Sequence, residues 1–152
     1  MTQLPGLDDT DKAIISVLQH DGRRPLTQVA ASVGLSEAAV RQRVTRLTSS
    51  GAMQIVAVAD PMMLGYQRRA MIGLSVEGDV IGVADRLAGI DQVDSVVLTA
   101  GSFDLLLEVV VVDDAALLDL LNDGIRSIPG VRGAETFVYL RHRKQTYAWG
   151  VA

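Results

Sequence analysis

The 152-residue sequence predicts an α+β protein that begins with short helices and continues with alternating strands and helices. Over the first 50 positions, apolar residues recur three and four residues apart, which is the spacing of amphipathic helices. From Arg68 the spacing changes: Ala70, Ile72 and Leu74 alternate with residues of a second face, as in a strand. We therefore expect a helical domain over residues 1–60, a linker over 61–67 and an α+β domain over 68–152.

The N-terminal domain is predicted to contain three short helices. Asp8 is a good N-cap for the first helix, and the Asp21-Gly22 pair ends it. Pro25 suits the start of the second helix, which stops near Gly34, and Ser36 caps the third. Their apolar sides are expected to carry Leu7, Ile14, Ile15, Leu18, Val29, Ala30, Ala31, Val40, Val44 and Leu47. Residues 53–59, rich in apolar and β-branched residues, are expected to form a short strand or wing before the linker.

The second and third helices carry the spacing of a helix-turn-helix. Two helices that cross closely need a small residue at the crossing, a glycine at the turn and an apolar residue that holds the second helix on the first. Ala30, Gly34 and Val40 stand at the required offsets. The sequence therefore predicts a winged helix-turn-helix, and double-stranded DNA as its partner.

Charge is compatible with that partner in spite of the net charge of −4. Residues 23–49 contain five arginines and the single acid Glu37, and distant acidic charges are attenuated over a Debye length of roughly 8–10 Å. Arginine pairs with guanine and glutamine with adenine, so Arg41 and Gln42 are the predicted base contacts. The predicted DNA-contacting residues are Arg23, Ser36, Glu37, Arg41, Gln42, Arg43, Thr45 and Arg46. The alternative is that the arginines of the third helix form a solvated face, with Arg43 bridged to Asp9, Asp11 or Glu37.

The C-terminal domain is predicted to follow the βαββαβ order of a ferredoxin-like fold. We expect strands over 68–77, 93–100, 103–112 and 133–141, and helices over 79–89 and 114–127, with Asp113 or Asp114 as a cap. Residues 99–102 form the hairpin between the middle strands, with Gly101 supplying unusual dihedral angles.

The third of these strands is apolar on both faces. One face carries Leu105, Leu107, Val109 and Val111, and the other carries Leu106, Val110 and Val112. Both helices of a ferredoxin-like domain cover the same face of the sheet, so the second face needs another cover. We predict at least a homodimer through this sheet. The alternative cover is the chain's own tail, residues 147–151.

The sequence lacks the residues that several classes of function require. There is no cysteine, and His20 and His142 have no partners at metal-ligand spacing. Gly101-Ser102 lacks the context of a nucleophile elbow. We therefore expect no catalytic residue, no metal and no cofactor, and a protein that is not an enzyme. No apolar run is long enough to span a bilayer and no targeting segment is visible, so we expect a cytoplasmic protein without a membrane partner.

Taken together, these motifs make the chain resemble the Lrp/AsnC family, the leucine-responsive or feast/famine regulators of prokaryotes. The matching segments are LDDTD (7–11), DGR (21–23), VA (29–30), VGLS (33–36), RVTRL (43–47), DP (60–61), TAGSFDLLL (99–107) and IPGV (128–131), with Val40, Gly51 and Thr136. The resemblance covers nearly the full length.

The resemblance implies a dimer-building ferredoxin-like domain, dimers that associate further, with an octamer favoured, and a small-molecule effector, usually an amino acid, bound between dimers near the hairpin. The effector positions that it implies are Thr99, Ala100, Gly101, Ser102, Asp104 and Thr136. Glycine exposes backbone N–H groups to a carboxylate, and Asp104 can accept from an ammonium group. The alternative is that Gly101 only turns the chain and Asp104 only satisfies the backbone of the turn.

The sequence thus predicts a sequence-specific, DNA-binding transcriptional regulator whose assembly or DNA binding is modulated by a small ligand. An effector-independent, DNA-compacting architectural protein is the alternative. A small α+β enzyme is the third possibility, which the lack of a nucleophile, metal cluster or paired carboxylates disfavours.

Overall fold

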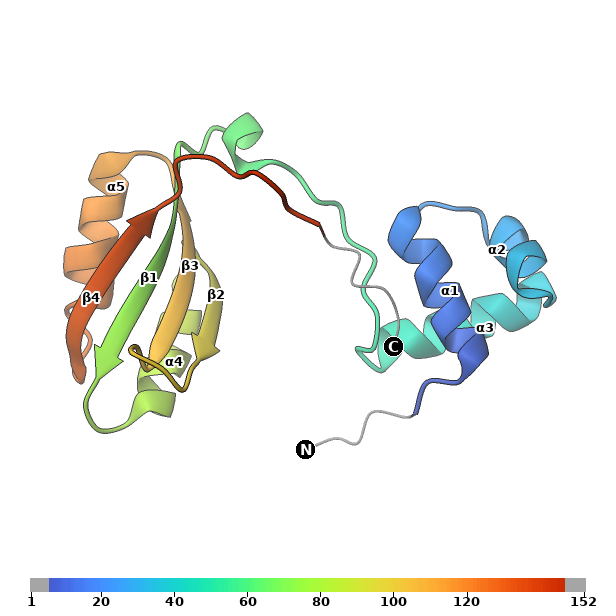
Figure 1. The fold of residues 1–152 in the computed structure, drawn as a ribbon, viewed down its shortest axis with the longest axis horizontal. Coiled ribbons are helices and arrows are strands. Elements are labelled where there is room, and N and C mark those ends of the chain that lie inside the picture. The colour runs from blue at the N-terminus through green and yellow to red at the C-terminus, as the bar shows by residue number, and fades with distance from the viewer. Residues whose placement is uncertain (1–5, 147–152) are drawn as a thin grey trace. The chain divides into compact units, whose positions relative to one another are not determined.

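The computed structural model describes residues 6–146, and the chain divides into two compact units. The helical unit extends to Val58, and the sheet unit spans Ala59–Arg143 (Figure 1).

The helical unit contains the three predicted helices, α1 (Asp9–His20), α2 (Leu26–Val33) and α3 (Glu37–Ser49). Asp8 caps α1 in a reciprocal capping box: the Asp11 N–H donates to the Asp8 carboxylate at 2.7 Å, and the Asp8 N–H donates to the Asp11 carboxylate at 3.3 Å. Ser36 caps α3, because its hydroxyl oxygen accepts from the Ala39 N–H. The predicted caps are confirmed. The buried core of the unit consists of Ile14, Ile15, Leu18, Val29, Ala30, Val40 and Leu47.

Gly34 ends α2 in the left-handed conformation, with φ of 69°. A Cβ at this position would meet no atom within 4 Å, so an alanine fits the space but not the backbone angle. Gly34→Ala is therefore expected to lower the stability of the helical unit by about 1 kcal/mol. Amide hydrogen exchange across α1–α3 measures this loss. Gly22→Ala is the matched control, because Gly22 lacks a positive φ and its Cβ would make only ordinary contacts. Equal exchange rates in both variants would contradict the assignment of strain to Gly34.

The prediction of a strand or wing over residues 53–59 is wrong, since these residues have no regular secondary structure. A strand needs a hydrogen-bonded neighbour, and the described residues offer none to this segment. Its apolar side chains remain in solvent, with Val56 67% exposed. A short 3-10 helix, η1 (Pro61–Leu64), follows within the predicted linker.

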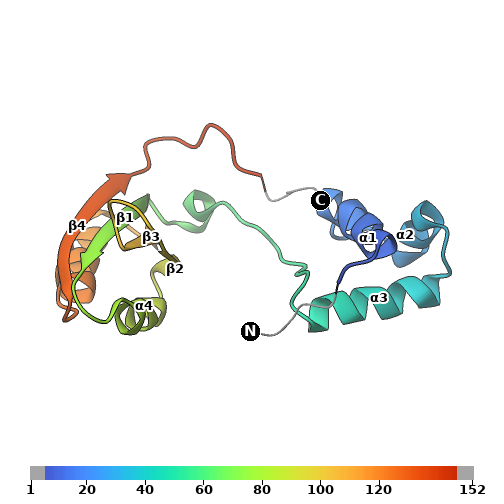
Figure 2. The same ribbon diagram turned by 60° about the horizontal axis from the view of Figure 1, so that its bottom comes forward.

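The sheet unit has the predicted ferredoxin-like order of elements. Its strands are β1 (Arg68–Val76), β2 (Val93–Leu98), β3 (Leu105–Val111) and β4 (Val131–Val138). They form an antiparallel sheet in the order β2-β3-β1-β4. Helix α4 (Val80–Ala88) and helix α5 (Asp114–Asp119), which continues as a π-helical segment (Leu120–Ile125), both lie on one face of the sheet (Figures 1 and 2). The cap of α5 is Asp113.

Strand boundaries differ from the expected ones by a few residues. β4 begins at Val131 instead of residue 133, because Val131 pairs with Val76 beyond an irregularity in the register. It ends at Val138, opposite Ala70, near the start of β1. β2 and β3 are both shorter at their shared turn, which leaves residues 99–104 as a loop.

The unusual dihedral angles expected at Gly101 are a second wrong prediction. Gly101 is not one of the described glycines that have a positive φ. The six-residue loop is longer than the expected tight turn and is closed by the Thr99 N–H, which donates to the Asp104 carbonyl at 3.0 Å. A loop of this length reverses the chain without a left-handed residue at Gly101.

The helices cover one face of the sheet and leave the other open, as predicted, although Val110 on the open face is only 7% exposed. On the helix-covered face, Leu105, Leu107, Val109 and Val111 of β3 are fully buried. We call the opposite side the open face, with Met71, Val97, Leu106, Glu108 and Phe137. Val97 and Phe137 are 50% and 45% exposed, and the Arg69–Glu108 ion pair, at 2.8 Å, lies on the same face. This face therefore combines apolar side chains with the Arg69–Glu108 pair and the exposed carboxylate of Glu135, which need polar partners in an interface.

Candidate nucleic-acid interface and effector loop

One side of α3 presents polar side chains to solvent. Arg41, Gln42 and Thr45 are exposed. Thr45 lies four positions from Arg41 and three from Gln42, so the three share a surface of the helix, while Val40 and Leu47 are buried on the other side. We call these three residues the α3 stripe. The Arg41 guanidinium donates to the Glu37 carboxylate at 2.5 Å yet remains 63% exposed. The stripe thus offers a cation and an amide that can both pair with base edges.

The other two arginines of α3 face α1. The Arg43 guanidinium donates to Asp8 and to Asp11, each at 2.7 Å, and the Arg46 guanidinium donates to Asp11 at 2.5 Å. Asp11 is only 1% exposed. We call these four residues the Asp11 cluster; it joins the start of α1 to the middle of α3. The ion pair that the sequence offered as an alternative for Arg43 is present, with Asp8 as an additional partner.

Two members of the cluster, Asp8 and Arg43, are stabilised in their charged forms by their contacts. The hydrogen bond from Arg43, together with that from the Asp11 N–H, lowers the pKa of the Asp8 carboxyl below its ordinary value of 3.8. The same contacts, first with Asp8 and then with Asp11, raise the pKa of the Arg43 guanidinium. Arg43 and Arg46 keep 29% and 51% of their side chains exposed, so both can still approach a phosphate from the rim of the cluster.

The remaining predicted DNA contacts lie before α3 or in its first turn. Arg23 is exposed in the loop between α1 and α2. Ser36 is exposed at the N-terminus of α3, where free N–H groups and the helix dipole favour an anion. Glu37, in the first turn, is the partner of Arg41.

The sequence named Asp11 only as one of three possible partners of Arg43 and did not predict that it is buried or that it also pairs with Arg46. Asp11, Ile14, Ile15 and Leu18 follow the spacing of one buried stripe. An acid within such a stripe requires cationic partners, and this signal was available.

The predicted effector positions of the hairpin lie in the loop of residues 99–104. Ala100, Gly101 and Ser102 are exposed at its tip. The Asp104 carboxylate accepts from the Val76 N–H at 2.7 Å, and the Asp104 N–H donates to the Leu74 carbonyl at 2.8 Å. One carboxylate oxygen of Asp104 therefore satisfies a backbone N–H at the end of β1, and not the backbone of its own turn as the alternative expected.

Thr136 lies apart from that loop within the chain. Thr136 belongs to β4, where it lies opposite Ile72 of β1 on the helix-covered face. In the sheet, β1 lies between β4 and the two strands that the loop joins. The neighbouring Phe137 does meet the loop, since its ring stands edge-on to Phe103 with centroids 6.3 Å apart. A Cβ on Gly73 would come within 2.5 Å of the Phe103 ring, so this glycine leaves room for the ring.

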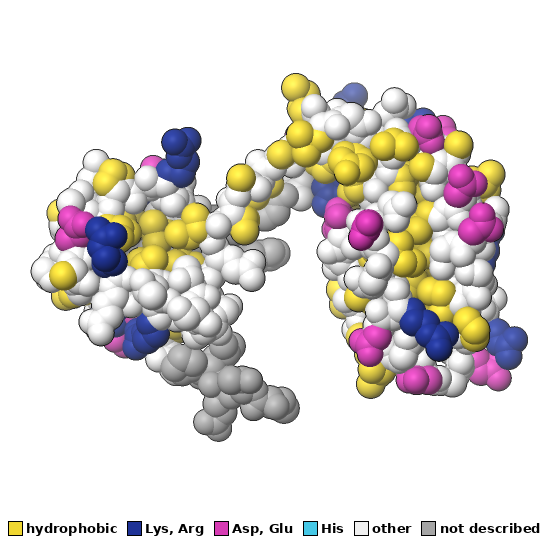
Figure 3. Space-filling view, turned by 180° about the vertical axis from the view of Figure 1, so that it is seen from behind, with side chains coloured by type: hydrophobic (Ala, Val, Ile, Leu, Met, Phe, Trp, Pro, Cys, Tyr) yellow, Lys and Arg dark blue, Asp and Glu magenta, His cyan; other side chains and the backbone are white. Residues whose placement is uncertain are grey.

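Other kinds of site find little support in residues 6–146. Within that range, no three His, Cys, Asp or Glu side chains gather as metal ligands. None of the helices described there has the length and apolar character needed to cross a membrane. In the view of Figure 3, acidic side chains outnumber basic ones on the visible face of the sheet unit, whereas basic side chains of the helical unit lie close to acidic ones.

Comparison with known proteins agrees with this geometry. Residues 7–48 match the AsnC-type helix-turn-helix domain, and residues 69–149 match the Lrp/AsnC ligand binding domain. The HTH-type transcriptional regulator FL11 of Pyrococcus horikoshii is 36% identical over 142 residues, which cover 92% of this chain and 93% of the relative.

Solved structures extend the comparison. The leucine response regulatory protein LrpA of Mycobacterium tuberculosis is 32% identical with a TM-score of 0.82, covering 91% of this chain and 96% of that chain. A transcriptional regulator of Neisseria meningitidis, solved as a complex with L-methionine, is 26% identical with a TM-score of 0.83, covering 97% of each chain. The chain therefore belongs to the Lrp/AsnC family of helix-turn-helix transcriptional regulators.

Proposed function

We propose that this regulator binds specific DNA sequences through the α3 stripe. The observation that carries the proposal is the division of labour on α3: the Asp11 cluster fixes the helix on α1, while Arg41, Gln42 and Thr45 remain exposed. A helix held by packing and ion pairs presents its base-contacting groups at low entropic cost. Arg23, Ser36, Arg43 and Arg46 then contact phosphates, and we expect the protein in the cytoplasm, where its DNA target lies.

A small ligand, an amino acid, is the proposed effector, and the loop of residues 99–104 is its proposed site. The exposed tip at Ala100, Gly101 and Ser102 supports this, because backbone N–H groups there can receive a carboxylate. The L-methionine complex of the Neisseria relative supports an amino acid as the ligand class. Asp104 adds to the proposed site a second carboxylate oxygen for an ammonium group. Thr136 lies apart from the loop within one chain, so in this proposal it comes from a second subunit.

The proposed assembly is a homodimer through the open face, with further association of dimers into an octamer. The exposed side chains of Val97 and Phe137 support an apolar interface on this face. The Arg69–Glu108 pair is expected to meet a polar group of the second subunit.

The test is a mobility-shift assay on DNA upstream of the protein's own gene and its neighbours, at fixed salt, with and without each amino acid. We expect a specific shift that one amino acid alters, and an altered assembly with the same amino acid in analytical ultracentrifugation. Gly101→Leu is expected to change this response and to preserve folding, because a Cβ at Gly101 meets no atom within 4 Å. Binding without sequence preference would favour the architectural alternative, and specific binding indifferent to every amino acid would remove the effector.

A further inference from the structure

A short run of basic residues follows the last strand of the sheet. Arg141, Arg143 and Lys144 lie within four consecutive positions, and residues 136–152 contain no Asp or Glu. All three residues are exposed, and the chain over residues 139–146 has no regular secondary structure. We call residues 141–144 the basic segment.

The positive charge of the basic segment is not compensated within residues 6–146. In that range, no ion pair or hydrogen bond joins the side chains of its three cations to another residue. The arginines Arg68 and Arg132, by contrast, are each paired with a carboxylate of the same sheet unit. Three neighbouring cations without counter-charges create a local positive potential, although the chain as a whole carries a net charge of −4. Such a potential attracts a partner with many negative charges.

The start of the basic segment is fixed to the sheet. The Tyr139 N–H donates to the Arg69 carbonyl at 2.9 Å, and the Arg69 guanidinium lies 5.7 Å from the centroid of the Tyr139 ring. The His142 ring stands edge-on to the same tyrosine, with centroids 5.0 Å apart. Because these contacts restrict the backbone that carries the cations, ordering it on a partner costs less entropy. The segment leaves the sheet at the end where the chain enters β1 (Figure 1).

Protection of a sheet edge is the usual role of cations near a strand, because charge there opposes pairing with another chain. β4 is an edge strand of this sheet. It ends at Val138, however, so the basic segment lies beyond the residues whose hydrogen-bonding groups need protection. The role of edge protection therefore does not explain these three cations.

We propose that the basic segment is a second DNA contact, at which Arg141, Arg143 and Lys144 bind phosphate groups without reading the bases. The inference rests on the proposed DNA binding of the helical unit, and DNA is the polyanion that a helix-turn-helix regulator meets. Guanidinium groups bind phosphates bidentately, and an ammonium group binds them as a point charge. The α3 stripe then selects the sequence, whereas the basic segment adds the same affinity for every sequence.

The test is the affinity for DNA as a function of salt, measured by fluorescence anisotropy on the specific site and on an unrelated duplex of the same length. In the triple variant Arg141→Gln, Arg143→Gln and Lys144→Gln, affinity at low salt is expected to fall about tenfold on both duplexes. The slope of log affinity against log salt concentration is expected to decrease by about 2–3, since each phosphate contact contributes about 0.9. The ratio of the two affinities should stay unchanged. The variant Arg141→Lys and Arg143→Lys, which keeps the charges, should retain the slope.

The triple variant Arg86→Gln, Arg126→Gln and Arg132→Gln is the matched control, because it removes the same charge from exposed positions outside the basic segment. It is expected to keep the slope. An equal decrease in both triple variants would reduce the effect to net charge and overturn the proposal, and so would an unchanged slope in the basic-segment variant.

Sedimentation of the same variants tests the other partner that the segment could meet, a second subunit. Loss of assembly with an unchanged salt slope would assign the basic segment to contacts between subunits and overturn the proposal. A slope that depends on the segment, in a protein without sequence preference, would support the second contact while removing the α3 stripe as the base-reading element. The two proposals therefore fail separately.

Discussion

Asp11→Ala is expected to destabilise the helical unit by about 2–3 kcal/mol while the sheet unit keeps its stability. The substitution removes the acceptor of three donors at once: the Arg43 and Arg46 guanidinium groups and the Asp8 N–H. Removing one partner of a fully buried ion pair costs more, about 3–5 kcal/mol. The loss is smaller here because both arginines are partly exposed and regain contact with water.

Hydrogen exchange followed by mass spectrometry separates the two units, since peptides from α1–α3 and from β1–β4 report on each. Protection should fall in α1–α3 only. Asp9→Ala is the matched control: Asp9 lies in the same first turn of α1 but is exposed, so only its interaction with the helix dipole is lost. If both substitutions lowered protection equally, the buried position of Asp11 would carry no special weight.

The double substitution of Arg41 and Gln42 by alanine is expected to weaken binding to the specific DNA site by about a hundredfold or more, as each bidentate base contact contributes about 1–3 kcal/mol. Folding should be preserved, because the partner described for Arg41 is the surface carboxylate of Glu37. Mobility shifts against the specific site and an unrelated sequence, for each variant, measure the change in preference.

Arg126→Ala controls for the loss of one positive charge, since the Arg126 guanidinium belongs to the sheet unit and donates to the side-chain amide oxygen of Asn122. It should leave the preference unchanged. Equal weakening on both DNA sequences by the Arg41 and Gln42 substitutions would show that these side chains contact phosphates and would remove their assignment as base contacts.

Local signals explain why the helical unit could be predicted well. A cap such as Asp8 or Ser36 and a breaker such as Gly34 act within one turn of a helix, so the residues nearby contain the whole cause. Strands depend on partners distant in the sequence. Residues 53–59 have the composition of a strand and lack a neighbour, and composition alone does not distinguish the two situations.

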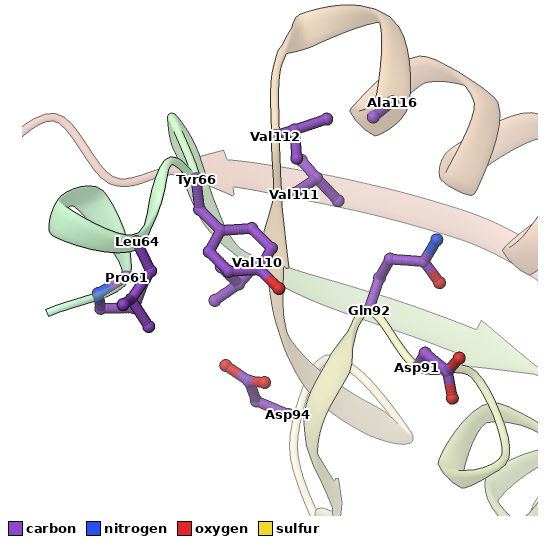
Figure 4. A pocket seen from close by; sticks show the side chains of 10 residues that line it. All are labelled: Pro61, Leu64, Tyr66, Asp91, Gln92, Asp94, Val110, Val111, Val112 and Ala116. Atoms are coloured by element: carbon purple, nitrogen blue, oxygen red, sulfur yellow. The ribbon is translucent and has the colours of Figure 1, made fainter. Parts of the chain in front are cut away.

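The candidate sites also differ in whether local sequence signals or distant partners determine them. The α3 stripe follows from helical spacing, and the same spacing could have indicated that Asp11 is buried. Its pair with Arg43 was one of the alternatives from the sequence, whereas its second pair, with Arg46, required the fold. A pocket lined by Tyr66 joins three separate segments of the sheet unit (Figure 4), and no pattern in the sequence brings Pro61, Asp94 and Val112 together. At the hairpin, the length of the loop decided the backbone at Gly101, and two residues at each strand end determined that length.

The Asp11 cluster also bears on how the protein searches a genome. Affinity for arbitrary DNA arises from counterions released as lysine and arginine neutralise phosphates. Arg43 and Arg46 are already paired with carboxylates within the helical unit, so their charge is partly neutralised before DNA binds. The chain as a whole also carries a net charge of −4, and both features lower its affinity for arbitrary DNA. Weak retention on the many competing sites leaves more of the protein free, and operator occupancy then depends on the few side chains that distinguish bases.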